Sequence, residues 1–107
     1  MLSVNIYLGG ALMLYAVGVY CLVTKRNMIK LVIGIEILAN AANLSFIALS
    51  TRLSPEGVLS VDPLGHSFVV ISIAIGGSII AVALAMVVSA YRHYKTLDVR
   101  ELKRFKW

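Results

Sequence analysis

Apolar residues fill three long stretches of the chain, Val4 to Val23, Met28 to Ser50 and Ser67 to Tyr91. About 20 helical residues cross a hydrocarbon core of roughly 30 Å, and each stretch reaches that length. The alternation of polar and apolar residues typical of a membrane β-barrel is absent. A single segment can then hydrogen-bond all of its backbone N–H and C=O groups in lipid only as a helix. The pattern predicts an all-α integral membrane fold with three transmembrane helices, over about 4–23, 28–50 and 63–91.

The third helix is expected to begin before its apolar stretch. Asp62 followed by Pro63 is typical of an N-cap and a first helical residue. Residues 92–107 then form a basic tail, in which Asp98 and Glu101 resemble a capping pair. The tail is either a short basic helix on the membrane surface or a solvated anchor. We interpret residues 1–107 as a single membrane domain.

Composition and charge support this interpretation. Only 14% of the residues are charged and 60% are hydrophobic, whereas about a quarter of a soluble domain is charged. The excess of positive charge is a topological signal and does not indicate nucleic-acid binding. No Lys or Arg precedes the first apolar stretch, so we expect it to stay in the mature protein instead of being cleaved as a signal peptide. The sole cysteine, Cys21, excludes an internal disulfide.

Lysine and arginine gather in two of the polar segments, the turn around Lys25, Arg26 and Lys30 and the tail after Tyr91. Cytoplasmic segments carry the excess of Lys and Arg in membrane proteins. This distribution predicts a multi-pass protein of the cell membrane with its N-terminus outside and its C-terminus in the cytoplasm.

Glu36 lies in the middle of the second apolar stretch, where a carboxylate costs free energy and commonly serves ion or proton passage. Asn40 and Asn43 follow at i+4 and i+7, so the three side chains share one helix face. One hypothesis is that Glu36 takes part in ion translocation and the asparagines extend a polar path. The other is that all three hydrogen-bond to neighbouring helices. We favour the second for the asparagines and the first for Glu36, because an amide links helices without a charge to bury.

Three further positions complete the candidates. His66, at the outer mouth of the third helix, is a possible member of the polar path, although a surface histidine is the simpler interpretation. Gly76 and Gly77 belong to two seams of small residues, Ser72 with Gly76 and Gly77 with Ala81 and Ala85, which favour helix packing on two sides. The sequence has no pattern typical of a catalytic, metal or cofactor site, so we predict no catalytic residue, metal ligand or cofactor in this chain.

Lys25-Arg26-Asn27, followed by the stretch from Ile33 to Leu44 around Glu36, resembles the small three-helix subunit K of complex I-type NADH dehydrogenases. The resemblance implies that Glu36 belongs to a chain of ionisable groups along a membrane arm. That family carries a second glutamate in its third helix, and our alignment places it at Gly77, so it is absent here.

The start of the third helix, Asp62-Pro63-Leu64, resembles the small three-helix subunit of Mrp-type sodium/proton antiporters, and Tyr94 to Arg100 resembles archaeal relatives. The combination of both features resembles membrane-bound hydrogenases and sulfane reductases with an Mrp-like module. The resemblance implies a non-catalytic subunit of a redox-driven or antiporter-type complex that moves protons or sodium ions. The implied partners are larger antiporter-like subunits, other small membrane subunits and the lipid bilayer.

Three other interpretations remain open. A rotor-ring subunit also has a carboxylate on its second helix, but usually has two helices and a glycine-dense first one. A small multidrug transporter would carry its glutamate in the first of four helices. In a purely structural scaffold, Glu36 would only pair with a neighbouring subunit.

Overall fold

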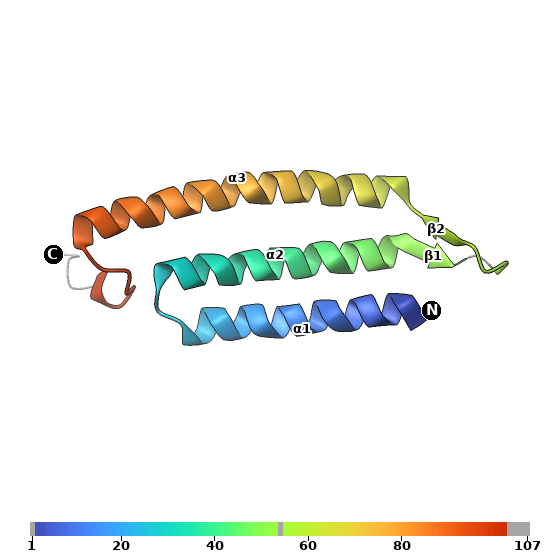
Figure 1. Ribbon diagram of the computed structural model, residues 1–107, viewed down its shortest axis with the longest axis horizontal. Coiled ribbons are helices and arrows are strands. Elements are labelled where there is room, and N and C mark those ends of the chain that lie inside the picture. Colours follow the sequence, from blue (N-terminus) through green and yellow to red (C-terminus); the bar gives the residue numbers. More distant parts are fainter. Residues whose placement is uncertain (1, 54, 103–107) are drawn as a thin grey trace.

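The computed structural model describes residues 2–53 and 55–102 of the chain. Three helices dominate it (Figure 1): α1 (Leu2–Thr24), α2 (Met28–Ser50) and α3 (Pro63–Tyr94). All three are long and apolar enough to cross a membrane, as the sequence predicted. A two-stranded hairpin, β1 (Thr51–Leu53) and β2 (Leu59–Val61), joins α2 to α3.

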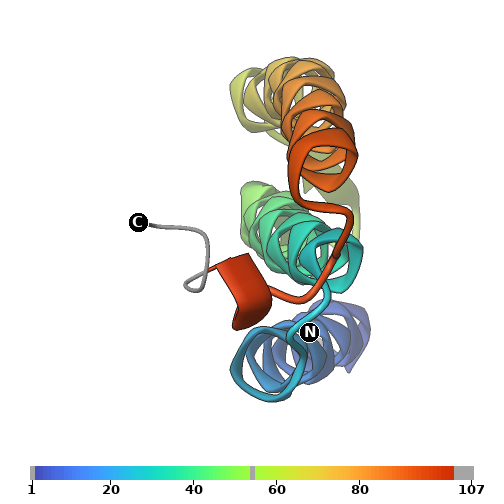
Figure 2. The same cartoon turned by 90° about the vertical axis from the view of Figure 1, so that its left-hand side faces the viewer.

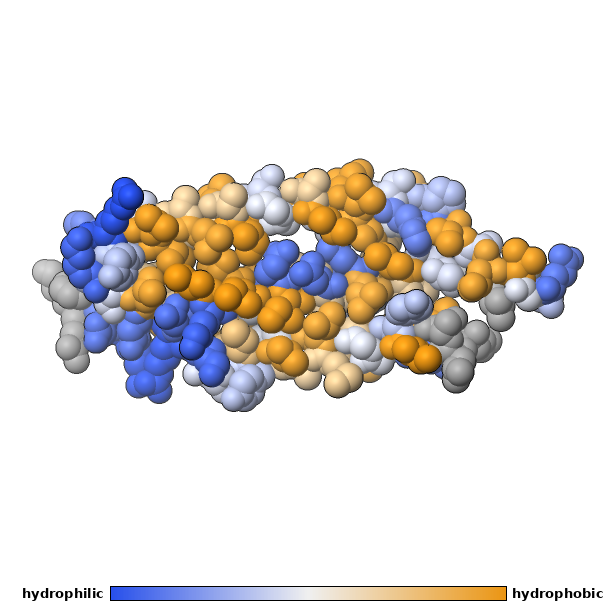
Figure 3. Space-filling view, in the orientation of Figure 1, coloured by the Kyte–Doolittle hydropathy of each residue, from blue (hydrophilic) through white to orange (hydrophobic). Residues whose placement is uncertain are grey.

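The helices lie side by side in one layer with α2 in the middle, as the end-on view shows (Figure 2). The molecule measures 65 × 24 × 15 Å, so the layer is about one helix thick. Most large apolar side chains are therefore exposed within this chain, and hydrophobic colour covers much of the surface along the helices (Figure 3). The described apolar side chains that are buried come from Ala11, Met28, Ala41, Ala48, Val69 and Val87.

Small residues bring α1 and α2 together. Gly18 is buried, and a Cβ added there would lie 2.7 Å from the Leu38 side chain. On the facing helix, a Cβ added at Gly34 would lie 3.3 Å from the Cβ of Cys21. Glycine at these positions lets the two helices approach closely.

The hairpin sets the start of α3. Its strands pair antiparallel, with Thr51 opposite Val61. Asp62 then caps α3, because its side-chain Oδ1 accepts a 3.0 Å hydrogen bond from the Leu64 N–H, with Pro63 in the first turn. The predicted cap is confirmed. The hairpin itself was not predicted.

The tail folds back onto the turn between α1 and α2. It leaves α3 through the C-cap Lys95, which has a left-handed backbone (φ 59°). The Met28 N–H donates to the Leu97 carbonyl at 2.9 Å, and the Val99 N–H donates to the Arg26 carbonyl at 2.9 Å. These bonds hold both basic segments at the same end of the molecule, opposite the hairpin (Figure 1). The predicted surface helix after Asp98 falls largely on residues 103–107, outside the described residues.

Candidate ion-translocation site

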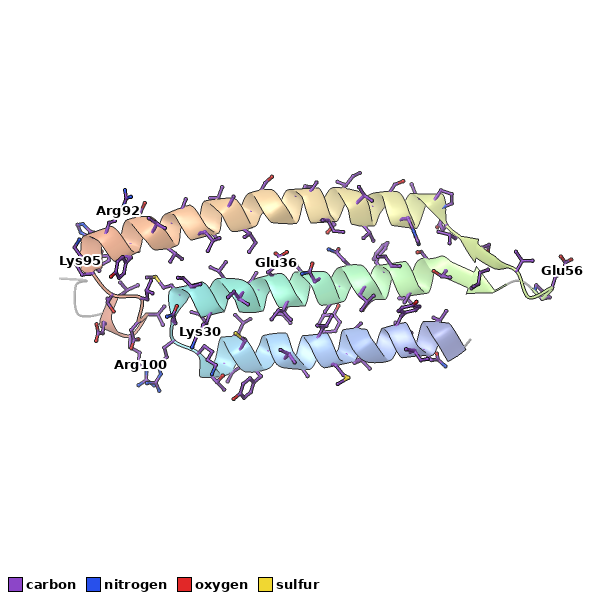
Figure 4. The ribbon with its side chains drawn as sticks, viewed as in Figure 1. Lys30, Glu36, Glu56, Arg92, Lys95 and Arg100 are labelled. Atoms are coloured by element: carbon purple, nitrogen blue, oxygen red, sulfur yellow. The ribbon has the colours of Figure 1, made fainter. Side chains whose placement is uncertain are left out.

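Glu36 lies near the middle of α2 and its side chain points toward α3 (Figure 4). The side chain is half-buried, and none of the described charged side chains is buried. We expected a buried carboxylate from the long apolar stretch around it. The expectation is wrong for the isolated chain because a layer one helix thick leaves both faces of α2 uncovered. Within the described part of the chain, Glu36 has no ion pair or hydrogen bond.

Asn43 connects α2 to α3. Its Oδ1 accepts a 2.8 Å hydrogen bond from the Ser72 hydroxyl, across a sequence separation of 29 residues. This bond agrees with the interpretation of Asn43 as an interhelical link. Asn40, one helical turn from Glu36, is exposed and has no partner among the described residues. Ser72 was predicted from the sequence only as a member of a small-residue seam, and its role as the partner of Asn43 was not predicted.

A cavity of about 290 Å³ opens between α2 and α3 beside this hydrogen bond. Asn43 and Ser72 supply its polar wall, and the rest of the wall is apolar. The lining residues are Ala42, Asn43, Phe46, Phe68, Val69 and Ser72.

His66 lies apart from this group, in the first turns of α3. It is half-buried, and its Nε2 atom is buried without a hydrogen-bond partner among the described residues. Ser72 lies about 9 Å farther along the helix axis, given a rise of 1.5 Å per residue. The structure does not bring His66 together with Glu36.

Gly76 and Gly77 differ in exposure, but neither has a close neighbour within this chain. Gly76 is half-buried and Gly77 is exposed, and a Cβ added at either would meet nothing within 4 Å. Neither glycine therefore packs tightly against another helix of this chain. Any close helix contact at these positions would have to come from another subunit.

In the part of the chain that the structure describes, no three His, Cys, Asp or Glu side chains cluster. The fold and the site define a small multi-pass membrane protein with a carboxylate at mid-helix and extensive apolar surface left for other contacts.

Comparison with known proteins identifies the family. The family described as NADH-ubiquinone/plastoquinone oxidoreductase chain 4L matches residues 6–107. NADH-quinone oxidoreductase subunit K of Desulfitobacterium hafniense is 36% identical over 99% of this chain and 100% of the relative. NAD(P)H-quinone oxidoreductase subunit 4L of Leptolyngbya boryana is 36% identical over 88% of each protein. The chain therefore belongs to the subunit K/4L family.

A solved structure extends the relationship. A chain from the membrane-bound sulfane sulfur reductase, an archaeal respiratory membrane complex, matches with a TM-score of 0.77 and 28% identity, covering 89% of this chain and 94% of that one. The resemblance to subunit K and to the sulfane reductase complexes is confirmed. The protein is a small multi-pass subunit of a complex I-like membrane complex.

Proposed function

We propose that this protein supplies Glu36 for proton or sodium translocation in a redox-driven or antiporter-type complex. The supporting observation is the position of Glu36: a carboxylate midway along a membrane-spanning helix, facing α3, with no ion-pair or hydrogen-bond partner among the described residues. An ionisable group at this depth is costly and typically marks an ion or proton pathway. The charge of Glu36 is balanced by a bound ion, a proton or a neighbouring subunit.

A scaffold role for Glu36 is the second candidate. The Asn43–Ser72 hydrogen bond favours a structural role for Asn43. Glu36 makes no comparable bond within the described residues, so a structural role for it requires a partner on another subunit. The family of the chain also argues against a rotor-ring subunit.

The partners that we propose are larger antiporter-like subunits and other small membrane subunits. Gly77, Ala81 and Ala85 are all exposed, and they form a seam of small residues along α3. Such seams let helices of other subunits approach closely.

Replacing Gly77 with Leu should weaken assembly, because the larger side chain would separate α3 from the neighbouring helix. We expect recovery of co-purifying subunits after gentle detergent extraction to fall at least about fivefold, a cost of ~1 kcal/mol or more from overpacking. Mass spectrometry of the extracted complex gives this measurement, with Gly77→Ala as the small-step control. Unchanged assembly would place Gly77 against lipid. Recovery of the wild-type chain as a homomeric ring or dimer would contradict a multi-subunit complex.

The orientation that we propose has the N-terminus outside and the tail in the cytoplasm, because the Lys25–Lys30 turn and the tail are basic and lie at the same end. A reporter fused after Trp107 should be active only if it is of the type that functions in the cytoplasm. Activity of an exported-type reporter at the same site would contradict the orientation.

A further inference from the structure

A groove lies between α2 and α3 at the end of the molecule that carries the basic turn and the tail. Its volume is about 390 Å³, within the range of about 300–1,000 Å³ that is typical of small-molecule sites. Three separate segments of the chain form it: the start of α2, the last turns of α3 and the tail. The lining residues are Ile29, Val87, Val88, Tyr91, Arg92 and Leu97.

The tail contributes one wall of this groove. The Met28 N–H donates a 2.9 Å hydrogen bond to the Leu97 carbonyl, which holds Leu97 beside the start of α2. The neighbouring bond from the Val99 N–H to the Arg26 carbonyl, also 2.9 Å, fixes the same part of the tail. The shape of the groove therefore follows from contacts between segments that are far apart in the sequence.

The groove changes from apolar to basic along α3. Val87 and Val88 belong to the apolar stretch of this helix, whereas Arg92 follows directly after that stretch. Val87 lies about 8 Å deeper in the membrane than Arg92, given a rise of 1.5 Å per residue. Tyr91, beside Arg92, is of a residue type that gathers at the membrane–water interface. A phospholipid has the same order, with its hydrocarbon chain in the membrane and its phosphate at the interface.

Positive charge predominates around the groove, and hydrophilic side chains gather at this end of the molecule (Figure 3). The basic side chains described there are Lys25, Arg26, Lys30, Arg92, Lys95 and Arg100, and the acidic ones are Asp98 and Glu101.

The cations nearest the groove have no counter-charge within the described chain. Asp98 accepts a 2.8 Å hydrogen bond from the Arg100 N–H inside the tail. The side chains of Arg92 and Lys95 make no hydrogen bond or ion pair with another described residue. Both lie at the same end of α3 (Figure 4). An anion that enters from the membrane interface would therefore meet two unpaired cations.

We propose that this groove binds one anionic phospholipid. Arg92 binds the phosphate, and Lys95 adds positive charge three residues farther along. One hydrocarbon chain lies against Val87, Val88 and Leu97. Basic pockets between membrane helices are typical sites for anionic lipid headgroups. A lipid without net charge would gain less from the two cations, and an acidic protein segment would leave the apolar wall uncovered.

Photolabelling of the assembled complex tests the site. The complex is reconstituted in phosphatidylcholine bilayers with a trace of phosphatidylglycerol or phosphatidylcholine that carries a diazirine in its hydrocarbon chain. Peptide mapping measures adducts on residues 87–97, relative to adducts on residues 64–70 at the opposite end of α3. We expect this ratio to be at least about fivefold higher for the phosphatidylglycerol probe.

Two results of this labelling would overturn the site. Equal ratios for the two probes would mean that residues 87–97 contact only ordinary surrounding lipid. No adduct from either probe would mean that a neighbouring subunit covers the groove.

Removal of one charge tests the headgroup position. Arg92→Gln should lower the phosphatidylglycerol adduct at least about fivefold and leave the phosphatidylcholine adduct unchanged. Arg100→Gln removes the same charge from the tail on the far side of this end, outside the groove (Figure 4), and should stay near wild type. Equal losses in both variants would mean that the basic surface attracts anionic lipid diffusely, without a site in the groove.

Filling the groove tests the position of the hydrocarbon chain. Val88 and Val70 are both exposed on α3, but only Val88 lines the groove. Val88→Trp should remove most of the phosphatidylglycerol adduct per assembled complex, whereas Val70→Trp should not. Unchanged labelling of Val88→Trp would contradict the proposed chain position. None of these measurements requires ion pumping, so they stand whether or not Glu36 takes part in translocation.

Discussion

Replacing Glu36 with Gln is expected to lower coupled ion pumping at least about tenfold, a barrier increase of ~1.4 kcal/mol or more, while the complex still assembles. Glutamine keeps the shape and hydrogen-bonding capacity of the side chain but cannot exchange a proton or balance a cation. Because Glu36 makes no hydrogen bond or ion pair within the described part of the chain, the substitution removes no such interaction there. The measurement is ion translocation by the reconstituted complex, normalised to assembled protein.

Two further substitutions separate this role from scaffolding. Glu36→Asp keeps a titratable carboxylate but withdraws it by one methylene, so pumping should be intermediate. A scaffold role predicts another order, in which Gln is tolerated and Glu36→Ala loses assembly and activity together. Normal pumping by the Gln variant would remove Glu36 from the essential path and leave the subunit as a scaffold.

Replacing Gly65 with Ala is expected to destabilise the α2–α3 pair by about 1–3 kcal/mol through overpacking. The new Cβ would lie 2.7 Å from the Cβ of Ser50. Neither atom can rotate away, because both are fixed directly to helix backbones, so the helices must separate. This cost exceeds the gain of up to about 1 kcal/mol that Ala has over Gly in a helix.

The control for Gly65 is Gly76→Ala, on the same helix, where the added Cβ meets nothing within 4 Å. The fraction of intact complex that survives graded heating should fall for Gly65→Ala and stay near wild type for Gly76→Ala. Equal survival of both variants would mean that the close approach of Gly65 and Ser50 is not required for stability.

Local patterns in the sequence were sufficient to predict the helices and the placement of the carboxylate. Apolar length identified all three membrane-spanning helices, and Asp62 marked the start of α3 through its capping chemistry. The i, i+4, i+7 spacing grouped Glu36 with Asn40 and Asn43 on one face of α2. These features depend only on neighbours along the same helix.

Features that depend on how separate segments meet were not predictable in this way. The hairpin, and the bonds from Met28 and Val99 that hold the tail, use backbone groups common to every residue. The Asn43–Ser72 bond and the space beside Gly76 depend on the register between two helices. The incomplete burial of Glu36 depends on the single-layer arrangement, which hydrophobic length does not specify.

The most direct test of the proposed function asks whether the Glu36 carboxylate changes state during turnover. Infrared difference spectra of the wild-type complex, recorded between resting and working states, should contain a carboxyl band that shifts or appears on turnover. The band should be altered in Glu36→Asp and absent in Glu36→Gln. An identical spectrum from the Gln variant and the wild type would contradict the claim that Glu36 exchanges a proton or an ion.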